Sequence, residues 1–100
     1  MDDHLRNLCE VLRQFDSQEA ANWLIKHYPI DHDNWGEAIY LIAHRSWLKI
    51  DQVRLARYYF QKLPFANGKV YEVFASFMSL SLLIQLIKEF LPTEASRLDL

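Results

Sequence analysis

Proline and glycine are so scarce in this chain that they limit where its secondary structure can break. The 100 residues contain three prolines and two glycines. Each proline follows a large apolar residue, in Tyr28-Pro29, Leu63-Pro64 and Leu91-Pro92. A helix usually ends before a proline, whereas a β-rich fold needs a turn about every 8–12 residues. Because 51% of the residues are hydrophobic, the chain is also too apolar to be disordered. We therefore expect an all-α fold.

Between these breaks, apolar residues recur at the three- and four-residue spacing of amphipathic helices. The join between the last two expected helices has no glycine or proline, so one long bent helix remains an alternative there. Thr93 is expected to cap a further helix that reaches the end of the sequence without a C-cap signal. The six predicted helices cover about residues 3–14, 17–28, 34–46, 50–63, 69–79 and 81–91.

The helical spacing also predicts which side chains form the core. Asp16, three residues before Glu19, is a capping-box pattern and predicts a helix start, and Asp51 predicts another. The residues expected to face inward are Leu5, Leu8, Cys9, Leu12, Phe15, Ala20, Trp23, Leu24, Tyr28, Trp35, Ala38, Ile39, Ile42, Val53, Ala56, Tyr59, Phe60, Leu63, Val70, Val73, Phe74, Phe77, Leu83, Leu86, Ile87 and Phe90.

A weak internal repeat suggests how the helices are arranged. Shifting the chain by 35 residues aligns Pro29 with Pro64, Glu37 with Glu72 and Ser46 with Ser81. Helix-pair solenoids repeat at about this interval. We expect one domain over residues 1–100, with five to seven helices in stacked antiparallel hairpins of the α-solenoid type. Chance similarity between amphipathic helices is the alternative.

The charges are divided into blocks. Residues 1–44 carry a net charge of −5, residues 45–69 carry +5 and residues 70–100 carry −2, although the whole chain is only −2. The acidic and basic blocks either attract each other within the fold or form surfaces for charged partners.

The sequence favours a cytoplasmic location. Cys9 is the only cysteine, as expected in a reducing compartment. The start, Met1-Asp2-Asp3, has no basic or apolar region of a secretory signal. The apolar stretch at 74–87 is too short to span a bilayer, so no membrane association is expected.

No metal site, cofactor or catalytic site is expected. The acidic segment 31–42 resembles a calcium loop at its start, but Ile42 stands where the bidentate glutamate is needed. His27 and His32 lie near Asp31 and Asp33, without a second ligand pair of zinc-site spacing. The four histidines lie in no catalytic motif, so the chain is predicted not to be an enzyme.

A basic stripe raises the alternative of nucleic-acid binding. Arg54, Arg57 and Gln61 share one face of the helix predicted at 50–63. The net charge of −2 makes nucleic acid an unfavourable principal ligand. The other basic and aromatic residues nearby are Arg45, Lys49, Tyr58 and Lys62.

The stretch Ser46–Ala56 (SWLKIDQVRLA), with Lys62–Ala66 (KLPFA) and Tyr71–Phe74 (YEVF), resembles small helical immunity proteins of bacterial contact-dependent growth inhibition systems. The likeness covers most of residues 30–92 and includes no diagnostic motif. It implies a cytoplasmic, non-catalytic inhibitor that binds a toxin domain, often a nuclease, of unidentified chemistry. A helical-repeat adaptor and a small nucleic-acid-binding regulator are the alternatives, and the oligomeric state is left open.

The expected interface is the acidic turn before the third predicted helix. Asp31, Asp33 and Glu37 would meet a basic toxin cleft, and Trp35 would serve as an aromatic anchor or else as a core residue. Asp16 and Glu19, at the other turn flanking the second helix, are helpers only, because an antiparallel hairpin places successive turns at opposite ends. The alternative interface is the basic face with Arg54 and Arg57.

Overall fold

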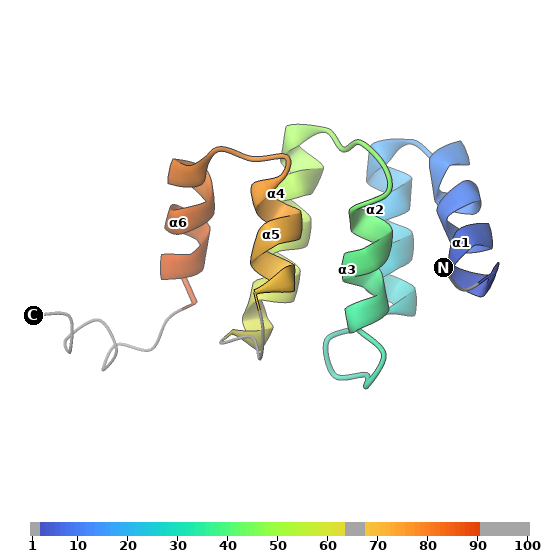
Figure 1. Ribbon diagram of the computed structural model, residues 1–100, viewed down its shortest axis with the longest axis horizontal. Coiled ribbons are helices and arrows are strands. Elements are labelled where there is room, and N and C mark those ends of the chain that lie inside the picture. The colour runs from blue at the N-terminus through green and yellow to red at the C-terminus, as the bar shows by residue number, and fades with distance from the viewer. Residues whose placement is uncertain (1–2, 64–67, 91–100) are drawn as a thin grey trace, which may run out of the picture.

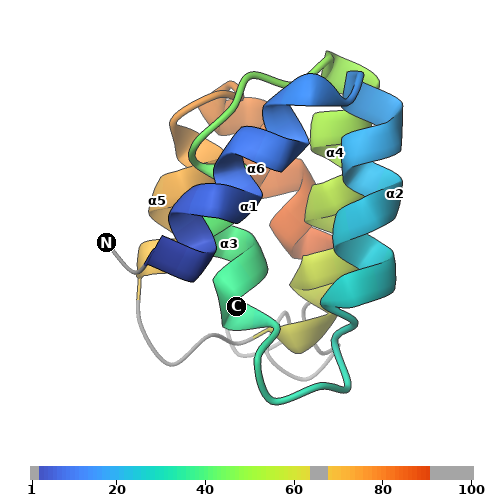
Figure 2. The same ribbon diagram turned by 90° about the vertical axis from the view of Figure 1, so that its right-hand side faces the viewer.

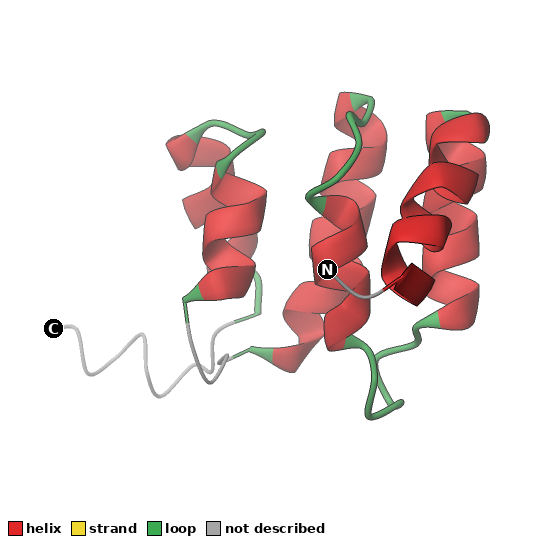
Figure 3. Cartoon of the chain, turned by 45° about the vertical axis from the view of Figure 1, so that its right-hand side comes forward, coloured by secondary structure: helices red, strands yellow, loops and turns green. Residues whose placement is uncertain are grey.

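The computed structural model describes residues 3–63 and 68–90, and the regular elements in these ranges are all helices (Figure 3). The all-α prediction is confirmed. The elements are α1 (Asp3–Gln14), α2 (Ser17–His27), α3 (Gly36–Ile42), α4 (Lys49–Tyr59), a short 3₁₀ helix η1 (Phe60–Lys62), α5 (Lys69–Ala75) and α6 (Leu80–Lys88).

The helices form two layers. Helices α1, α3 and α5 lie in one layer, and α2, α4 and α6 lie in the other (Figures 1 and 2). Within the layers α3 packs between α1 and α5, and α4 packs between α2 and α6. Successive helices run in opposite directions, so the chain makes three stacked hairpins, α1–α2, α3–α4 and α5–α6 (Figure 1).

The helix starts show the true period of the repeat. Helices α1, α3 and α5 begin at residues 3, 36 and 69, which are 33 residues apart, whereas α2, α4 and α6 begin at 17, 49 and 80, which are 32 and 31 apart. The predicted shift of 35 is therefore wrong by two to four residues. The prolines do not mark equivalent positions in the repeat. Pro29 comes two residues after α2 ends at His27, whereas η1 lies between the end of α4 and Leu63, the residue before Pro64.

Several helices are shorter than predicted. The helix expected at 34–46 covers only Gly36–Ile42, with Trp35 at its N-cap and Ala43 at its C-cap. Beyond this end the side chain of Arg45 reaches back toward α1. The helix expected at 50–63 begins at Lys49 and tightens into η1 after Tyr59. The helices expected at 17–28 and 81–91 cover Ser17–His27 and Leu80–Lys88, and the helix expected from Thr93 lies outside the described residues.

Two serines separate α5 from α6 and exclude the alternative of one long helix. The hydroxyl of Ser76 donates to the carbonyl of Val73 at 2.6 Å, just after α5 ends at Ala75 rather than at residue 79. Such side-chain bonds compete with helix continuation. Ser79 then caps α6, because its Oγ accepts the backbone N–H of Leu82 at 3.2 Å.

The core lies between the two layers. The largest fully buried side chains are Tyr59, Phe60, Phe74, Leu12, Leu24, Leu41, Ile42, Leu55 and Leu86. Leu41 and Leu55 were not among the predicted core residues. The predicted core residues that are only half-buried, packed against the edge of the core, are Leu5, Leu8, Phe15, Trp23, Trp35, Val53, Leu63, Phe77, Ile87 and Phe90. The buried hydroxyl of Tyr59 donates to the carbonyl of Tyr28 at 2.9 Å, which joins two neighbouring hairpins.

Arg45 fastens the second hairpin to the first. Its Nη1 donates to the carbonyls of Leu12 and Phe15 at 2.6 and 3.0 Å, at the end of α1. Both carbonyls lie at the end of α1, where helical donors run out, and that of Leu12 also accepts the backbone N–H of Phe15 at 3.3 Å. The guanidinium carbon also lies 4.6 Å from the ring centre of Trp47. Burial lowers the pKa of Arg45, although the nearby carboxylates of Asp16 and Asp51 act in the opposite direction.

None of the described helices is long and apolar enough to cross a membrane.

Candidate functional site

The predicted acidic turn joins α2 to α3 at one end of the stack (Figure 1). Asp31 and Asp33 are exposed there and form no hydrogen bond or ion pair with other described residues. Their carboxylates are therefore available to a partner.

Trp35 is mainly a packing residue. Its half-buried ring stacks on Tyr59, with ring centres 6.3 Å apart and planes 21° apart. The ammonium of Lys62 lies 5.9 Å from the centre of the same ring. Of the two roles left open by the sequence, packing accounts for these contacts.

Glu37 holds the turn in place. The hydroxyl of Tyr28 donates to its Oε1 at 2.9 Å. Burial, reinforced by this hydrogen bond and the nearby charge, raises the pKa of Tyr28 to about 12. The carboxylate of Glu37 is thus already engaged within the fold.

The two helper residues lie away from the acidic turn. Asp16 caps α2, because its Oδ1 accepts the backbone N–H of Glu19 at 2.8 Å, as the capping pattern predicted. Since α2 has 11 residues and rises about 1.5 Å per residue, roughly 16 Å separates its two ends. The six acidic-interface residues therefore do not form one patch.

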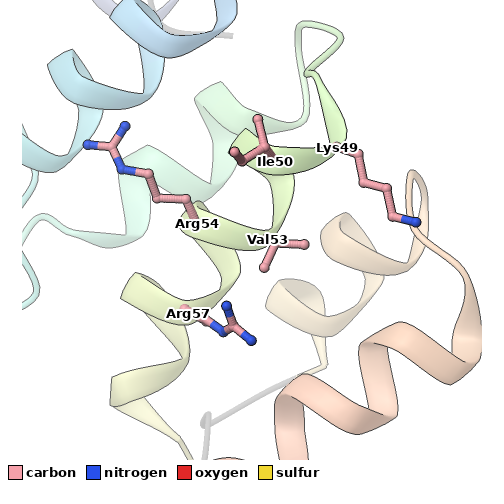
Figure 4. A pocket seen from close by; sticks show the side chains of 5 residues that line it. All are labelled: Lys49, Ile50, Val53, Arg54 and Arg57. Atoms are coloured by element: carbon pink, nitrogen blue, oxygen red, sulfur yellow. The ribbon is translucent and has the colours of Figure 1, made fainter.

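Two strongly exposed large apolar side chains lie at the start of α4, and a third, Leu80, lies at the start of α6. Leu48 has 64% and Ile50 has 75% of its surface exposed. Together with Lys49, Val53, Arg54 and Arg57 they make up what we call the α4 surface (Figure 4).

Two grooves flank Ile50 and Arg54. One, of about 650 Å³, is lined by Lys49, Ile50, Val53, Arg54 and Arg57. In Figure 4, Ile50 and Arg54 point toward α2, whereas Val53 and Arg57 point toward α6. The other, of about 370 Å³, lies between α2 and α4 and is lined by Gln18, Asn22, Leu48, Ile50, Asp51 and Arg54.

The α4 surface is cationic, and its charges are only partly neutralised. Arg57 forms a two-pronged ion pair with Glu89, with nitrogen–oxygen distances of 3.1 and 3.2 Å. This hydrogen bonding raises the pKa of Arg57. Arg54 donates only to the neutral amide oxygen of Asn22, and Lys49 has no ion-pair partner among residues 3–63 and 68–90.

The orientation of α4 follows from a buried polar contact. The Oγ of Ser17 donates to Oδ2 of Asp51 at 2.5 Å and accepts the backbone N–H of Leu48 at 3.0 Å. Asp51, predicted as a helix-starting residue, is instead only 3% exposed and faces α2. With Asp51 on the inner face, Ile50 and Arg54 lie on the outer face, four residues apart.

The sequence prediction placed Arg54 and Arg57 in the alternative interface but missed Leu48 and Ile50. A usable signal was present, because Ile50, Arg54 and Arg57 have the spacing of one helix face. An apolar residue on a face with two arginines does not fit an ordinary core stripe.

Arg54 and Arg57 of the predicted nucleic-acid stripe line one groove of α4, but several of the neighbouring basic side chains point elsewhere or are paired. Arg45 is directed to the carbonyls of α1, Lys62 lies over Trp35, and Arg57 is paired with Glu89. In the described part of the chain no three side chains of His, Cys, Asp or Glu gather where they could hold a metal ion.

No protein-family model, curated protein or solved structure matches this chain.

Proposed function

We propose that this chain is a non-catalytic protein-binding module whose partner docks on the α4 surface. The observation that carries the proposal is the pairing of two strongly exposed large apolar side chains, Leu48 and Ile50, with incompletely neutralised cations at two adjoining grooves. Apolar residues surrounded by charge are typical of interface centres with a polar rim.

A site-specific photo-crosslinker tests the docking surface. A benzophenone amino acid replaces Ile50 in one variant, Asp33 in a second and Glu10, on the exposed side of α1, in a third. We expect one discrete adduct in cells from position 50 and none from position 10. Unlabelled wild-type protein should compete for this adduct, whereas an Ile50→Asp competitor should not. Equal labelling from positions 50 and 10 would contradict the proposal.

Toxin neutralisation is the second candidate, and the exposed carboxylates of Asp31 and Asp33 favour it. The resemblance to immunity proteins implies that the partner would be a toxin domain met in the cytoplasm. A basic toxin cleft would be attracted to this turn rather than to the cationic α4 surface.

If a toxin domain is encoded beside this reading frame, it is the partner with which the second candidate is tested. Asp31→Ala combined with Asp33→Ala should weaken binding by tenfold or more, while Glu37→Gln keeps the contact to Tyr28 and serves as the control. An adduct from position 33 that contains the toxin, with none from position 50, would replace the first proposal by the second. If the double variant binds the toxin as tightly as wild type, the acidic-turn interface is excluded.

A further inference from the structure

We infer that the α4 surface recognises an acidic segment of another protein that also carries large apolar side chains. This inference rests on the proposed function and adds the chemistry of the partner. The apolar side chains would cover Leu48 and Ile50, and the carboxylates would face Lys49 and Arg54.

The apolar half of the surface lies at the start of α4. Leu48 is the N-cap residue and Ile50 belongs to the first turn, so both side chains stand at one end of the groove. Val53 is half-buried beside Ile50 in the larger groove, whereas Leu48 lines the smaller one. A partner without apolar groups would leave this end uncovered.

The cations lie beside and beyond these apolar side chains. Lys49 stands between Leu48 and Ile50, and the two arginines follow as the helix rises about 10 Å from Ile50 to Arg57, so a partner segment must carry both apolar and acidic groups within that length. The charge of Arg57 is already paired with Glu89. Arg54 and Lys49 are therefore the principal attractions for a partner's carboxylates.

The charge distribution of the whole chain supports an external acidic partner. Residues 45–69 carry a net charge of +5 and residues 1–44 carry −5. Among the described residues, the one ion pair closer than 4 Å joins Arg57 to Glu89 in α6 rather than to the acidic block. The positive charge of α4 is therefore not cancelled by direct pairing with the first 44 residues.

Nucleic acid and anionic membranes are less suited to this surface than an acidic polypeptide. Both would meet a chain of net charge −2 in which Arg45 and Lys62 are directed away from the cations of the α4 surface. An acidic polypeptide combines a small number of charges with apolar side chains. This combination matches a surface on which Ile50 lies beside Arg54.

Selection from a random 16-residue peptide phage library tests the inference. The bait proteins are the wild-type chain, Ile50→Asp, Arg54→Glu and Arg6→Glu. The last variant makes the same charge change on exposed α1 and is the matched control. Circular dichroism checks that each variant is folded, as expected for substitutions at exposed positions.

We expect the wild type and Arg6→Glu to enrich peptides with a net negative charge and at least two large apolar residues. Synthetic copies should bind Ile50→Asp and Arg54→Glu at least tenfold more weakly, and their affinity for wild type should fall as salt is raised. Replacing each peptide Glu or Asp by Gln or Asn should weaken binding similarly.

The contrary outcomes separate the two proposals. Peptides that depend on Ile50 but are neutral or basic would overturn the acidic partner and leave the docking surface intact. No enrichment, or peptides indifferent to Ile50→Asp, would overturn both. Tighter binding to a 20-nucleotide single strand or to phosphatidylserine vesicles than to any selected peptide, lost in Arg54→Glu, would replace the acidic polypeptide by that ligand.

Discussion

Ser17 and Asp51 show how a single polar pair sets the position of the functional helix. Both side chains are buried, with 7% and 3% of their surface exposed. Ser17 bonds simultaneously to the carboxylate of Asp51 and to the backbone N–H of Leu48. A buried polar group is costly unless it is hydrogen-bonded, so this contact fixes the start of α4 against α2.

Removing either partner should therefore destabilise the fold. We expect Ser17→Ala and Asp51→Ala each to lower the free energy of unfolding by about 1–3 kcal/mol, because each leaves a buried group unsatisfied. The double variant should lose less than the sum of the two. Urea denaturation measures the effect, and Asp33→Ala, at an exposed position, should stay within about 0.5 kcal/mol of wild type. Additive losses would show that the pair is not coupled.

Two buried tyrosines predict a loss of stability in alkaline solution. Burial and the bond to Glu37 raise the pKa of Tyr28 from 10 to about 12, and burial raises the pKa of Tyr59 even more. Between these values the unfolded chain releases protons that the folded chain retains. The stability is therefore complete below pH 10 and decreases as the pH rises from 10 through 12.

Denaturation midpoints between pH 8 and 12 measure this loss. We expect Tyr28→Phe, which cannot ionise, to show a shallower alkaline decline than wild type. Tyr40→Phe is the control, because it removes the hydroxyl of another half-buried tyrosine, one whose ring packs against His44. An unchanged slope in Tyr28→Phe would contradict the assignment.

At the scale of elements, the sequence predicted the helices well where periodicity decides and poorly where single side chains decide. The helix at 3–14 and the cap at Asp16 were correct because both depend on local patterns. The end of α5 depends on Ser76 and the orientation of α4 depends on Ser17. The second contact joins residues 34 positions apart, which no local pattern reveals.

The candidate site was predicted only in part for the same reason. Asp31 and Asp33 are exposed as expected, because a polar turn between helices has nothing to pack against. Glu37 and Trp35 were assigned to a partner but contact Tyr28 and Tyr59 inside the fold. Such contacts depend on how the hairpins stack, and the exposure of Ile50 depends on it too.

The role of Asp16 as a cap rather than a binding residue gives an element-scale prediction. Asp16→Ala should lower the free energy of unfolding by about 1 kcal/mol, because the N–H of Glu19 loses its acceptor. Asp16→Ser keeps an acceptor and is the control. Faster amide exchange in the first turn of α2 should accompany the loss. If Asp16→Ala were fully stable but lost partner binding, Asp16 would be an interface residue instead.

At the scale of the whole molecule, the two charge blocks behave as separate surfaces of one stack. The acidic turn, which joins α2 to α3, lies at one end of the stack, and the α4 surface begins at the other end, where α4 starts (Figure 1). Asp16 is used in a helix cap and Glu37 in a contact to a tyrosine, rather than in ion pairs with the basic block. Direct ion pairs between the blocks are thus absent from residues 3–63 and 68–90, and the attraction that remains acts at longer range, as between Asp16 and Arg45.

This division predicts that salt affects binding more than folding. Raising sodium chloride from about 20 mM to about 500 mM shortens the screening length several-fold. We expect the free energy of unfolding to change by less than about 0.5 kcal/mol, since exposed ion pairs contribute little. Association with an acidic partner should slow markedly over the same range, because long-range attraction steers the encounter.

Glu89→Gln isolates the one ion pair that spans α4 and α6. This variant removes the charge that faces Arg57 while keeping an amide able to accept a hydrogen bond. It should fold with nearly wild-type stability and bind an acidic partner faster, because Arg57 then joins Arg54 and Lys49 in attracting it. Urea denaturation and stopped-flow association at both salt concentrations measure the two effects. A strong loss of wild-type stability at high salt would mean that the acidic and basic blocks hold each other in the folded chain, and that the cations of α4 are not free for a partner.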